Sequence, residues 1–189
     1  MDEARLQQVL DRMEISDTII RFARALDIKD WELCRSCFIN EIETDYSDLR
    51  GQPASSIKAD EFVELRRKAL SGLKTQHLST NHIITIEGNE ATCISCMVIH
   101  RILPNKEGED FFDTHGYYTH TLVRTSQGWK ISKVKQTVLW NKGNPQIHLG
   151  ALHNSPESYP AIAPNTQITQ SKQLLFNGKL PNVDNYWLR

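Results

Sequence analysis

Asp27, Tyr46, His77 and His100 have the side-chain types that general acid–base catalysis uses. A histidine takes and gives protons near neutral pH, a carboxylate can orient its ring, and a phenol can donate a hydrogen bond to a developing oxyanion. Each also has a structural explanation: Asp27 could end a helix, Tyr46 could be an ordinary strand aromatic, and His100 a satisfied core histidine. The sequence contains no P-loop, dinucleotide fingerprint, zinc-protease or serine-hydrolase motif.

Helices are expected in the first part of the chain, and they set the places of Asp27 and Tyr46. The first 26 residues are predicted to form one helix, because apolar side chains recur there at helical spacing: Ile15, Ile19, Phe22 and Leu26. Asp27 directly follows this stripe. Further helices are expected to start near Asp30, whose side chain can cap a helix, and at Asp60. A short strand over 42–46 would end at Tyr46, and 51–56 would form a loop.

The second part of the chain is predicted to form long strands. Polar and apolar side chains alternate over 82–87, 91–103, 117–124 and 129–140. His77 would lie just before the first of these strands. His100 is expected to point into the core, because it shares a mostly apolar strand face with Thr92, Ile94, Cys96 and Val98. Helices followed by antiparallel strands indicate an α+β fold, in which a curved sheet wrapped by helices would enclose a pocket.

The cysteines form two C-x-x-C pairs, Cys34/Cys37 and Cys93/Cys96, a spacing that zinc sites use. The first pair falls in a predicted helix. The second falls in a predicted strand, where residues three apart point to opposite faces. Neither pair lies on the tight turn that would bring both thiolates to one ion. We therefore expect the cysteines to pack as small apolar side chains, and no metal site.

The overall composition narrows the class of protein. The chain has 189 residues and a formal net charge of -1, which fits one folded domain without a basic footprint for nucleic acid. No apolar run is long enough for a membrane helix and the N-terminus does not resemble a secretory signal, so a cytoplasmic protein is expected. The near-neutral charge favours an uncharged or weakly charged organic substrate. Residues 1–140 are expected to form the domain, and 141–189 a C-terminal extension packed on it or on a neighbouring subunit.

Residues 25–31 (ALDIKDW) resemble the L-D-x-x-D-W segment of the SnoaL-like group within the nuclear transport factor 2-like superfamily. The pattern looks most similar to scytalone dehydratase and the bile-acid dehydratases. The likeness spans roughly residues 10–140 and continues at 45–46 (DY), 75–77 (TQH), His100 and 128–131 (GWKI). It implies a cone-shaped α+β barrel, in which a strongly curved, mixed and mostly antiparallel sheet is wrapped by N-terminal helices around the active site.

The resemblance also implies roles for the site residues. Asp27 and His77 match the family's carboxylate–histidine pair, Tyr46 its polarising tyrosine and His100 its second pocket histidine. The residues expected to line the substrate pocket are Phe22, Leu26, Val98, Tyr118 and Trp140. This scheme needs no metal or organic cofactor, and relatives associate as trimers or dimers, so a homo-oligomer is expected.

The implied activity is a dehydratase acting on a cyclic hydroxy-ketone or similar secondary metabolite of polyketide or terpenoid type. Two departures from the family keep alternatives open. Leu26 and Phe22 stand where scytalone dehydratase and the bile-acid enzymes, respectively, carry a further tyrosine, and the pocket asparagine is absent near Tyr118. An isomerase or cyclase using the same pocket, or a non-catalytic ligand-binding protein, remains an alternative.

Overall fold

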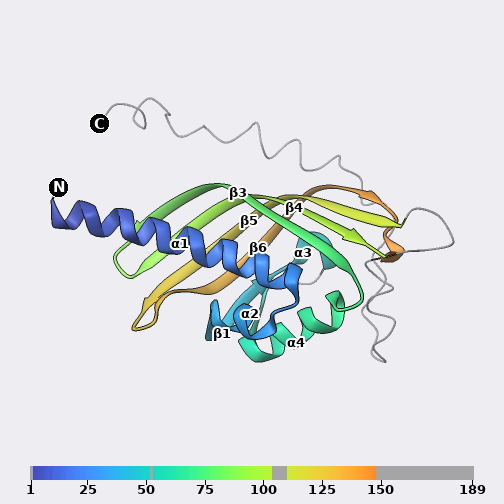
Figure 1. Cartoon of the computed structure of the whole chain (residues 1–189), viewed down its shortest axis with the longest axis horizontal. Coiled ribbons are helices and arrows are strands. Elements are labelled where there is room, and N and C mark those ends of the chain that lie inside the picture. Colours follow the sequence, from blue (N-terminus) through green and yellow to red (C-terminus); the bar gives the residue numbers. More distant parts are fainter. Residues whose placement is uncertain (1, 52, 104–109, 148–189) are drawn as a thin grey trace. The chain divides into compact units, whose positions relative to one another are not determined.

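Helices occupy the first part of the chain and a curved six-stranded sheet most of the rest, in the computed structural model (Figure 1). The structure describes residues 2–51, 53–103 and 110–147. The helices are α1 (Glu3–Ile28), α2 (Trp31–Ser36), α3 (Ser47–Arg50) and α4 (Ala59–Leu70). The strands are β1 (Phe38–Asp45), β2 (Ser55–Lys58), β3 (Lys74–Glu87), β4 (Glu90–Ile102), β5 (Phe111–Thr125) and β6 (Gly128–Gly143). The predicted C-terminal extension lies outside the described residues beyond Ile147.

Side-chain caps and a left-handed residue set the ends of the first two helices. The Asp2 carboxylate accepts a hydrogen bond from the Ala4 backbone N–H at the start of α1, and Lys29, with a φ of 61°, ends the helix. The Asp30 carboxylate accepts from the Leu33 N–H at 2.9 Å and starts α2, as predicted. Asp27 therefore lies in the last turn of α1 instead of after it. No helix in the described ranges is long and apolar enough to span a membrane.

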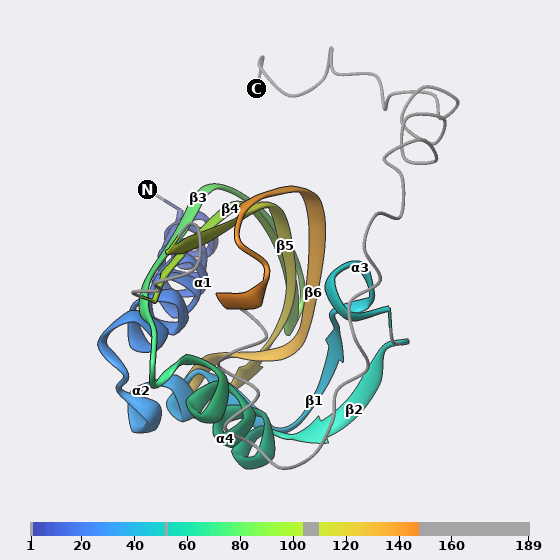
Figure 2. The same ribbon diagram turned by 90° about the vertical axis from the view of Figure 1, so that its right-hand side faces the viewer.

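The strands form one open sheet in the order β2-β1-β6-β5-β4-β3. β1 runs parallel to β6, and every other neighbouring pair is antiparallel. β2 and β3 are the two edges, so the sheet curves without closing. Figure 2 shows the sheet wrapping around an interior, with α1 alongside β3 and with α2 and α4 at the base. The predicted α+β class and the curved, mixed and mostly antiparallel sheet are confirmed.

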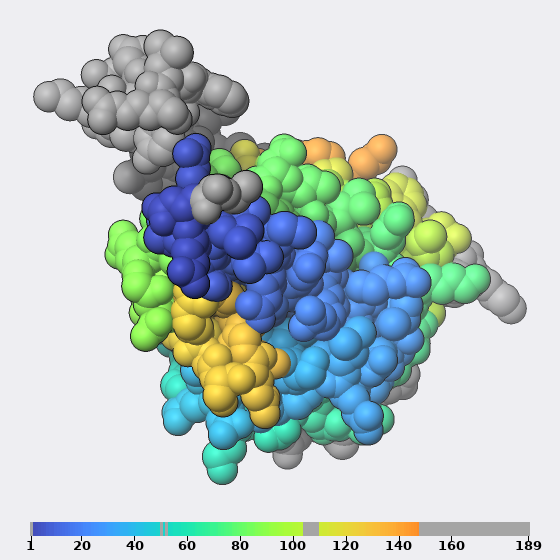
Figure 3. Space-filling view, turned by 60° about the vertical axis from the view of Figure 1, so that its left-hand side comes forward, coloured from blue at the N-terminus to red at the C-terminus, as the bar shows by residue number. Residues whose placement is uncertain are grey.

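The inner face of the sheet packs against α1 and holds the core. On β4 the odd-numbered residues from 91 to 101 are buried. Trp129 of β6 lies beneath α1, where its indole N–H donates to Asp11 and its backbone N–H donates to Glu14, each at 3.1 Å. Figure 3 shows α1 and the β5–β6 turn side by side on the surface above these contacts. They fix α1 across the inner face and so place Asp27, at the end of α1, beside β3.

Two strands begin earlier than their sequence patterns predicted. β3 starts at Lys74 and not at residue 82, because a register shift between Thr80 and Ile83 interrupts the alternation of its side chains. β5 starts at Phe111 and not at residue 117, and residues 55–58, predicted in part as loop, form the edge strand β2. His77 consequently lies within the edge strand β3, where it pairs with Ile99 of β4.

The cysteines pack inside the fold. Cys34, Cys37 and Cys93 are buried, and Cys96 is half-buried on the opposite face of β4 from Cys93. Burial raises the pKa of Cys34 to about 12 and the pKa values of Cys37 and Cys93 to about 11. These thiols stay protonated near neutral pH, which is the behaviour of small apolar core side chains.

Candidate active site

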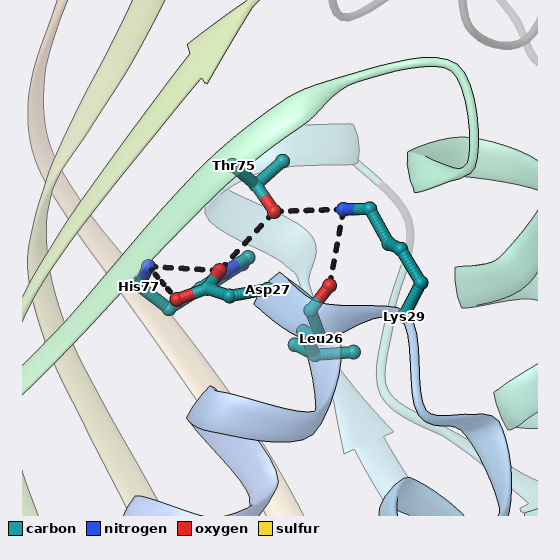
Figure 4. Close-up of polar contacts among 5 residues, drawn as sticks. All are labelled: Leu26, Asp27, Lys29, Thr75 and His77. Atoms are coloured by element: carbon teal, nitrogen blue, oxygen red, sulfur yellow. Dashed lines mark hydrogen bonds and ion pairs between the residues drawn. The ribbon is translucent and has the colours of Figure 1, made fainter.

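The end of α1 and the start of β3 bring Asp27 and His77 together on the inner face of the sheet (Figure 4). Asp27 Oδ1 lies 2.6 Å from His77 Nδ1, and the His77 backbone N–H donates to Asp27 Oδ2 at 2.9 Å. The two side chains are 12% and 8% exposed, respectively. Because the carboxylate accepts from Nδ1, the neutral ring carries its proton there and Nε2 holds the free lone pair. Among the described residues, no hydrogen bond uses Nε2.

Thr75 and Lys29 hold the carboxylate from the other side (Figure 4). The Thr75 hydroxyl donates to Asp27 Oδ1 at 3.1 Å. The Lys29 ammonium donates to Thr75 Oγ1 at 2.8 Å and to the Leu26 carbonyl at 3.0 Å. Thr75 and His77 are two residues apart on β3 and therefore point to the same face. Asp27 thus accepts from the His77 ring, the His77 backbone and Thr75, which fixes the orientation of its carboxylate.

The electrostatics of the pair favour a charged Asp27 and a neutral His77. Burial acts to raise the pKa of Asp27, but the hydrogen bonds from His77 and Thr75 outweigh it and leave the pKa below its ordinary value. Burial lowers the pKa of His77, and the charges of Arg101 and Lys29 lower it further, against the opposing effect of Asp27. His77 is therefore unprotonated at neutral pH, which is the state that a general base requires.

Tyr46 directly follows β1, one residue beyond the end of the strand, and is buried. Its ring stacks with that of Phe62 at 6.5 Å between centroids, and the Arg66 guanidinium lies 4.7 Å from its centroid. Tyr46 also contributes to the raised pKa of Tyr118, whose main cause is burial. The two phenols are therefore close enough to interact electrostatically in the interior.

His100, Val98 and Trp140 lie on the outer face of the sheet, so the expectation that they point into the interior is wrong. The buried residues of β4 are the odd-numbered ones, which places Val98 and His100 outside. His100 is 39% exposed and its ring lies 3.0 Å from Asp113. Val98 pairs with His115, whose ring stacks at 3.5 Å on that of Trp140. Both faces of β4 are rich in apolar residues, so the alternation alone did not distinguish the inner face, and the packing of α1 decides it.

Arg101, the residue after His100, points inward and was missed by the sequence-based prediction. It is 3% exposed, and its Nη1 donates to Thr114 Oγ1 at 2.9 Å. Once the inner face of β4 was known, a cationic residue on the same face as Ile99 and Met97 would have indicated a functional side chain. Arg101 therefore takes the inward position on β4 that had been assigned to His100.

Other polar side chains also lie on the inner face of β5 and β6. Gln136 Nε2 donates to the hydroxyl of Tyr118, the predicted pocket residue, at 3.0 Å. His120 is 1% exposed, and within the described ranges neither of its ring nitrogens has a hydrogen-bond partner. Burial lowers the pKa of His120 to about 3, so its ring is neutral at neutral pH.

Phe22 and Leu26, the predicted apolar wall, are buried on α1. Phe22 meets the ring of Phe38 edge-on at 5.0 Å and that of His120 at 6.1 Å. Thr75, Gln76 and His100 are among the residues that line an open groove of about 480 Å³. The chain after β6, orange in Figure 2, turns into the interior, and its Ile147 is buried. The described segment 144–147 thus covers part of the inner face.

The model of the family described as "SnoaL-like domain" matches residues 7–135. The chain belongs to the SnoaL-like family. The matched SnoaL-like region runs from α1 into β6 and includes Asp27, Tyr46, His77 and Arg101. No curated protein sequence matches the chain.

Solved structures share this SnoaL-like fold over nearly their whole length. Kfla4162 from Kribbella flavida is 26% identical, with a TM-score of 0.72 over 75% of this chain and 99% of that one. A Novosphingobium aromaticivorans protein provisionally named a scytalone dehydratase is 16% identical, with a TM-score of 0.63 and coverages of 76% and 92%. A type 2 hexachlorocyclohexane dehydrochlorinase (LinA) is 17% identical, with a TM-score of 0.63 and coverages of 74% and 93%. At these identities the last two likenesses concern the fold.

Proposed function

We propose that the protein is a cofactor-independent dehydratase that removes water from a cyclic hydroxy-ketone, such as a polyketide- or terpenoid-type metabolite. The observation that carries the proposal is the 2.6 Å contact between Asp27 Oδ1 and His77 Nδ1 on the inner face of a SnoaL-like domain. Support also comes from the names of two structural neighbours, a scytalone dehydratase and a dehydrochlorinase, since both names denote eliminations. The SnoaL-like family contains enzymes that convert small molecules.

In the proposed reaction, His77 Nε2 removes the proton next to the substrate carbonyl, and the electron pair of that C–H bond forms an enolate. Tyr46 donates a hydrogen bond to the enolate oxygen. The enolate then forms the new C=C bond while the C–O bond at the β-carbon breaks with its electron pair. The His77 imidazolium returns its proton to the departing oxygen, so water leaves and the ring is neutral again. Asp27 stabilises the imidazolium between the two transfers.

His77 acts as both base and acid in this scheme, because the other candidates do not fit the second role. His100 lies on the outer face, and His120 is unprotonated at neutral pH because burial lowers its pKa to about 3. Arg101 keeps its proton at neutral pH. With a single ring handling both protons, the proton and the hydroxyl must leave from the same face of the substrate. General base catalysis of this kind contributes roughly 10²–10⁴-fold to the rate.

The same observation favours isomerisation or cyclisation as the second candidate. If the imidazolium returns its proton to carbon in place of oxygen, the product is an isomer and no water is lost. In a cyclisation the enolate carbon would attack a second carbonyl of the same substrate, and the oxygen of that carbonyl would take the proton from the imidazolium. These reactions and the dehydration share the first step at His77.

The test uses a panel of cyclic β-hydroxy-ketones incubated with the protein in D₂O. Dehydration releases water and lowers the mass of the substrate, whereas isomerisation without dehydration incorporates deuterium next to the carbonyl. The His77→Ala and Asp27→Asn variants should lose both activities. His100→Asn is the matched control, because it changes a histidine on the outer face. Turnover at the wild-type rate in both dyad variants would refute the proposal, and binding without exchange or mass loss would indicate a ligand-binding protein.

We further propose that the protein forms a homo-oligomer through the outer face of the sheet. Apolar side chains that are at least 40% exposed lie on neighbouring strands of that face, among them Leu78, Ile94, Tyr117 and Trp140. Apolar side chains gathered in this way mark association surfaces. Sedimentation analysis of the wild type and of Trp140→Glu should show a dimer or trimer that the variant weakens. A wild-type monomer at micromolar concentration would contradict it.

A further inference from the structure

Arg101 carries a buried positive charge that makes no direct ion pair with a described carboxylate, although the charge of Asp113 acts on it. Its side chain donates from Nη1 to Thr114 Oγ1, and Nε has no hydrogen-bond partner. Within the described ranges, no carboxylate forms an ion pair with its guanidinium. Taking such a charge out of water is costly unless it is paired. In the described part of the chain, this buried cation therefore keeps unused hydrogen-bonding capacity at Nε.

The free side of the guanidinium has the shape that a carboxylate fits. Thr114 accepts from Nη1, whereas Nε, on the other edge of the guanidinium, has no hydrogen-bond partner among the described residues. The N–H groups on that edge are parallel and match the two oxygens of a carboxylate. The ring of Phe112 lies 5.6 Å from the guanidinium carbon and helps to fix its plane.

A second guanidinium, that of Arg66 on α4, lies in the same interior. Its Nε is also buried without a partner in the described part of the chain, and its guanidinium carbon lies 4.7 Å from the Tyr46 ring centroid. Burial lowers the pKa of Arg101 to about 10, and the like charge of Arg66 contributes. Both cations counteract the effect of burial on the pKa of Tyr118. Two positive charges therefore act on one region of the inner face.

Arg101 is also a neighbour of the proposed base. Thr75 pairs with Arg101 across β3 and β4, and His77 pairs with Ile99. Arg101 and His77 are thus diagonal neighbours on the inner face, a relation in which two residues lie about 7–8 Å apart. An anionic group bound to Arg101 would place the adjoining carbons of the same molecule near His77 Nε2.

We infer that Arg101, assisted by Arg66, binds a carboxylate of the substrate, so that the substrate is a cyclic organic acid. This rests on the proposed function in so far as the ligand is a substrate, whereas the binding of an anion does not depend on catalysis. The near-neutral charge of the chain favoured an uncharged or weakly charged substrate, and Arg101 favours a substrate with one negative group. The long-range field plays little part, because the chain has a net charge of only -1.

The test compares benzoate with benzamide, which has the same shape without the charge, by isothermal titration calorimetry at constant ionic strength. Wild-type protein should bind benzoate at least tenfold more tightly than benzamide, since a bidentate charged pair is worth a factor of ten or more. Arg101→Met should lower the benzoate affinity at least tenfold and leave that of benzamide within about twofold. Arg67→Met is the matched control, because Arg67 is exposed on α4 and pairs with Glu64.

Three results would overturn the inference: equal affinity of the wild type for the two probes, an undiminished benzoate affinity in Arg101→Met, or no benzoate binding at millimolar concentration. The wild-type comparison needs no variant, so it holds even if Arg101→Met does not fold. The Asp27→Asn variant separates this inference from the proposed function. It should retain benzoate binding or bind more tightly, since a negative charge is removed, while losing turnover. Benzoate binding without turnover of any hydroxy-ketone would count against the dehydratase only.

Discussion

Replacing Asp27 with asparagine should disrupt the dyad while keeping its shape. The carboxylate accepts hydrogen bonds from the His77 ring at 2.6 Å, from the His77 backbone at 2.9 Å and from Thr75 at 3.1 Å. An amide offers one accepting oxygen and turns an NH₂ group toward one of these donors. At least one donor is then left facing another donor. The asparagine also carries no charge to stabilise a His77 imidazolium.

The magnitude follows from the contacts that are lost. Hydrogen bonds to charged groups contribute about 1.5–3 kcal/mol each, so the loss of one should lower the free energy of unfolding by about 2 kcal/mol at pH 7. Turnover should fall by roughly 10²–10⁴-fold. The charge and the hydrogen bond of Asp27 both raise the pKa of His77 against the larger effect of burial. Their removal should therefore move the titration of His77 to lower pH.

The assay is a ¹H–¹⁵N NMR titration of the histidine rings, which needs no substrate, combined with urea unfolding. Wild-type His77 should be the Nδ1–H tautomer at pH 7 and should titrate below the ordinary value of about 6.5. In Asp27→Asn it should titrate lower still and lose the fixed tautomer. Asp113→Asn, which removes the carboxylate beside His100, is the control and should leave His77 unchanged. A His77 titration that moves to higher pH in Asp27→Asn would show that Asp27 does not stabilise the imidazolium.

Three further predictions follow from other parts of the structure. His100→Asn should leave kcat and KM within about twofold of wild type, because the ring is on the outer face; a hundredfold loss would restore it to the site. The pKa of His120 is about 3 in the folded state and about 6.5 in the unfolded state. Below pH 6.5 the unfolded state therefore binds a proton that the folded state does not bind, and the stability decreases as the pH is lowered. His120→Leu should thus lose about 1.4 kcal/mol less than wild type between pH 7.5 and 5.5 in urea unfolding, and an identical loss would contradict this. Asp11→Asn should lower the free energy of unfolding by about 2 kcal/mol, because it breaks a bidentate pair with Arg124 at 2.6 Å; a loss below 0.5 kcal/mol, on the order of a surface change, would be the contrary result.

The sequence determined the features that depend on local pattern. The apolar stripe ending at Leu26, the cap at Asp30 and the period of two in the second half indicated the helices, the strands and the α+β class. The chain around Asp27 and His77 resembled the SnoaL-like family closely enough to propose the pair. Both residues lie where one helix ends and one strand begins, so the pairing needed little knowledge of the sheet. The structure places their side chains 2.6 Å apart.

The tertiary structure decided which face of each strand became the inside. A strand with apolar residues on both sides, such as β4, has two possible inner faces, and a choice off by one residue exchanges Arg101 for His100. The same ambiguity explains why Val98 and Trp140 were expected to point inward, although they lie on the outer face. The packing of α1, which contacts Trp129 of β6, selects one face for burial. This contact joins segments more than a hundred residues apart. Local periodicity contains no information about that contact, so the burial of the Arg101 charge could be recognised only from the tertiary structure.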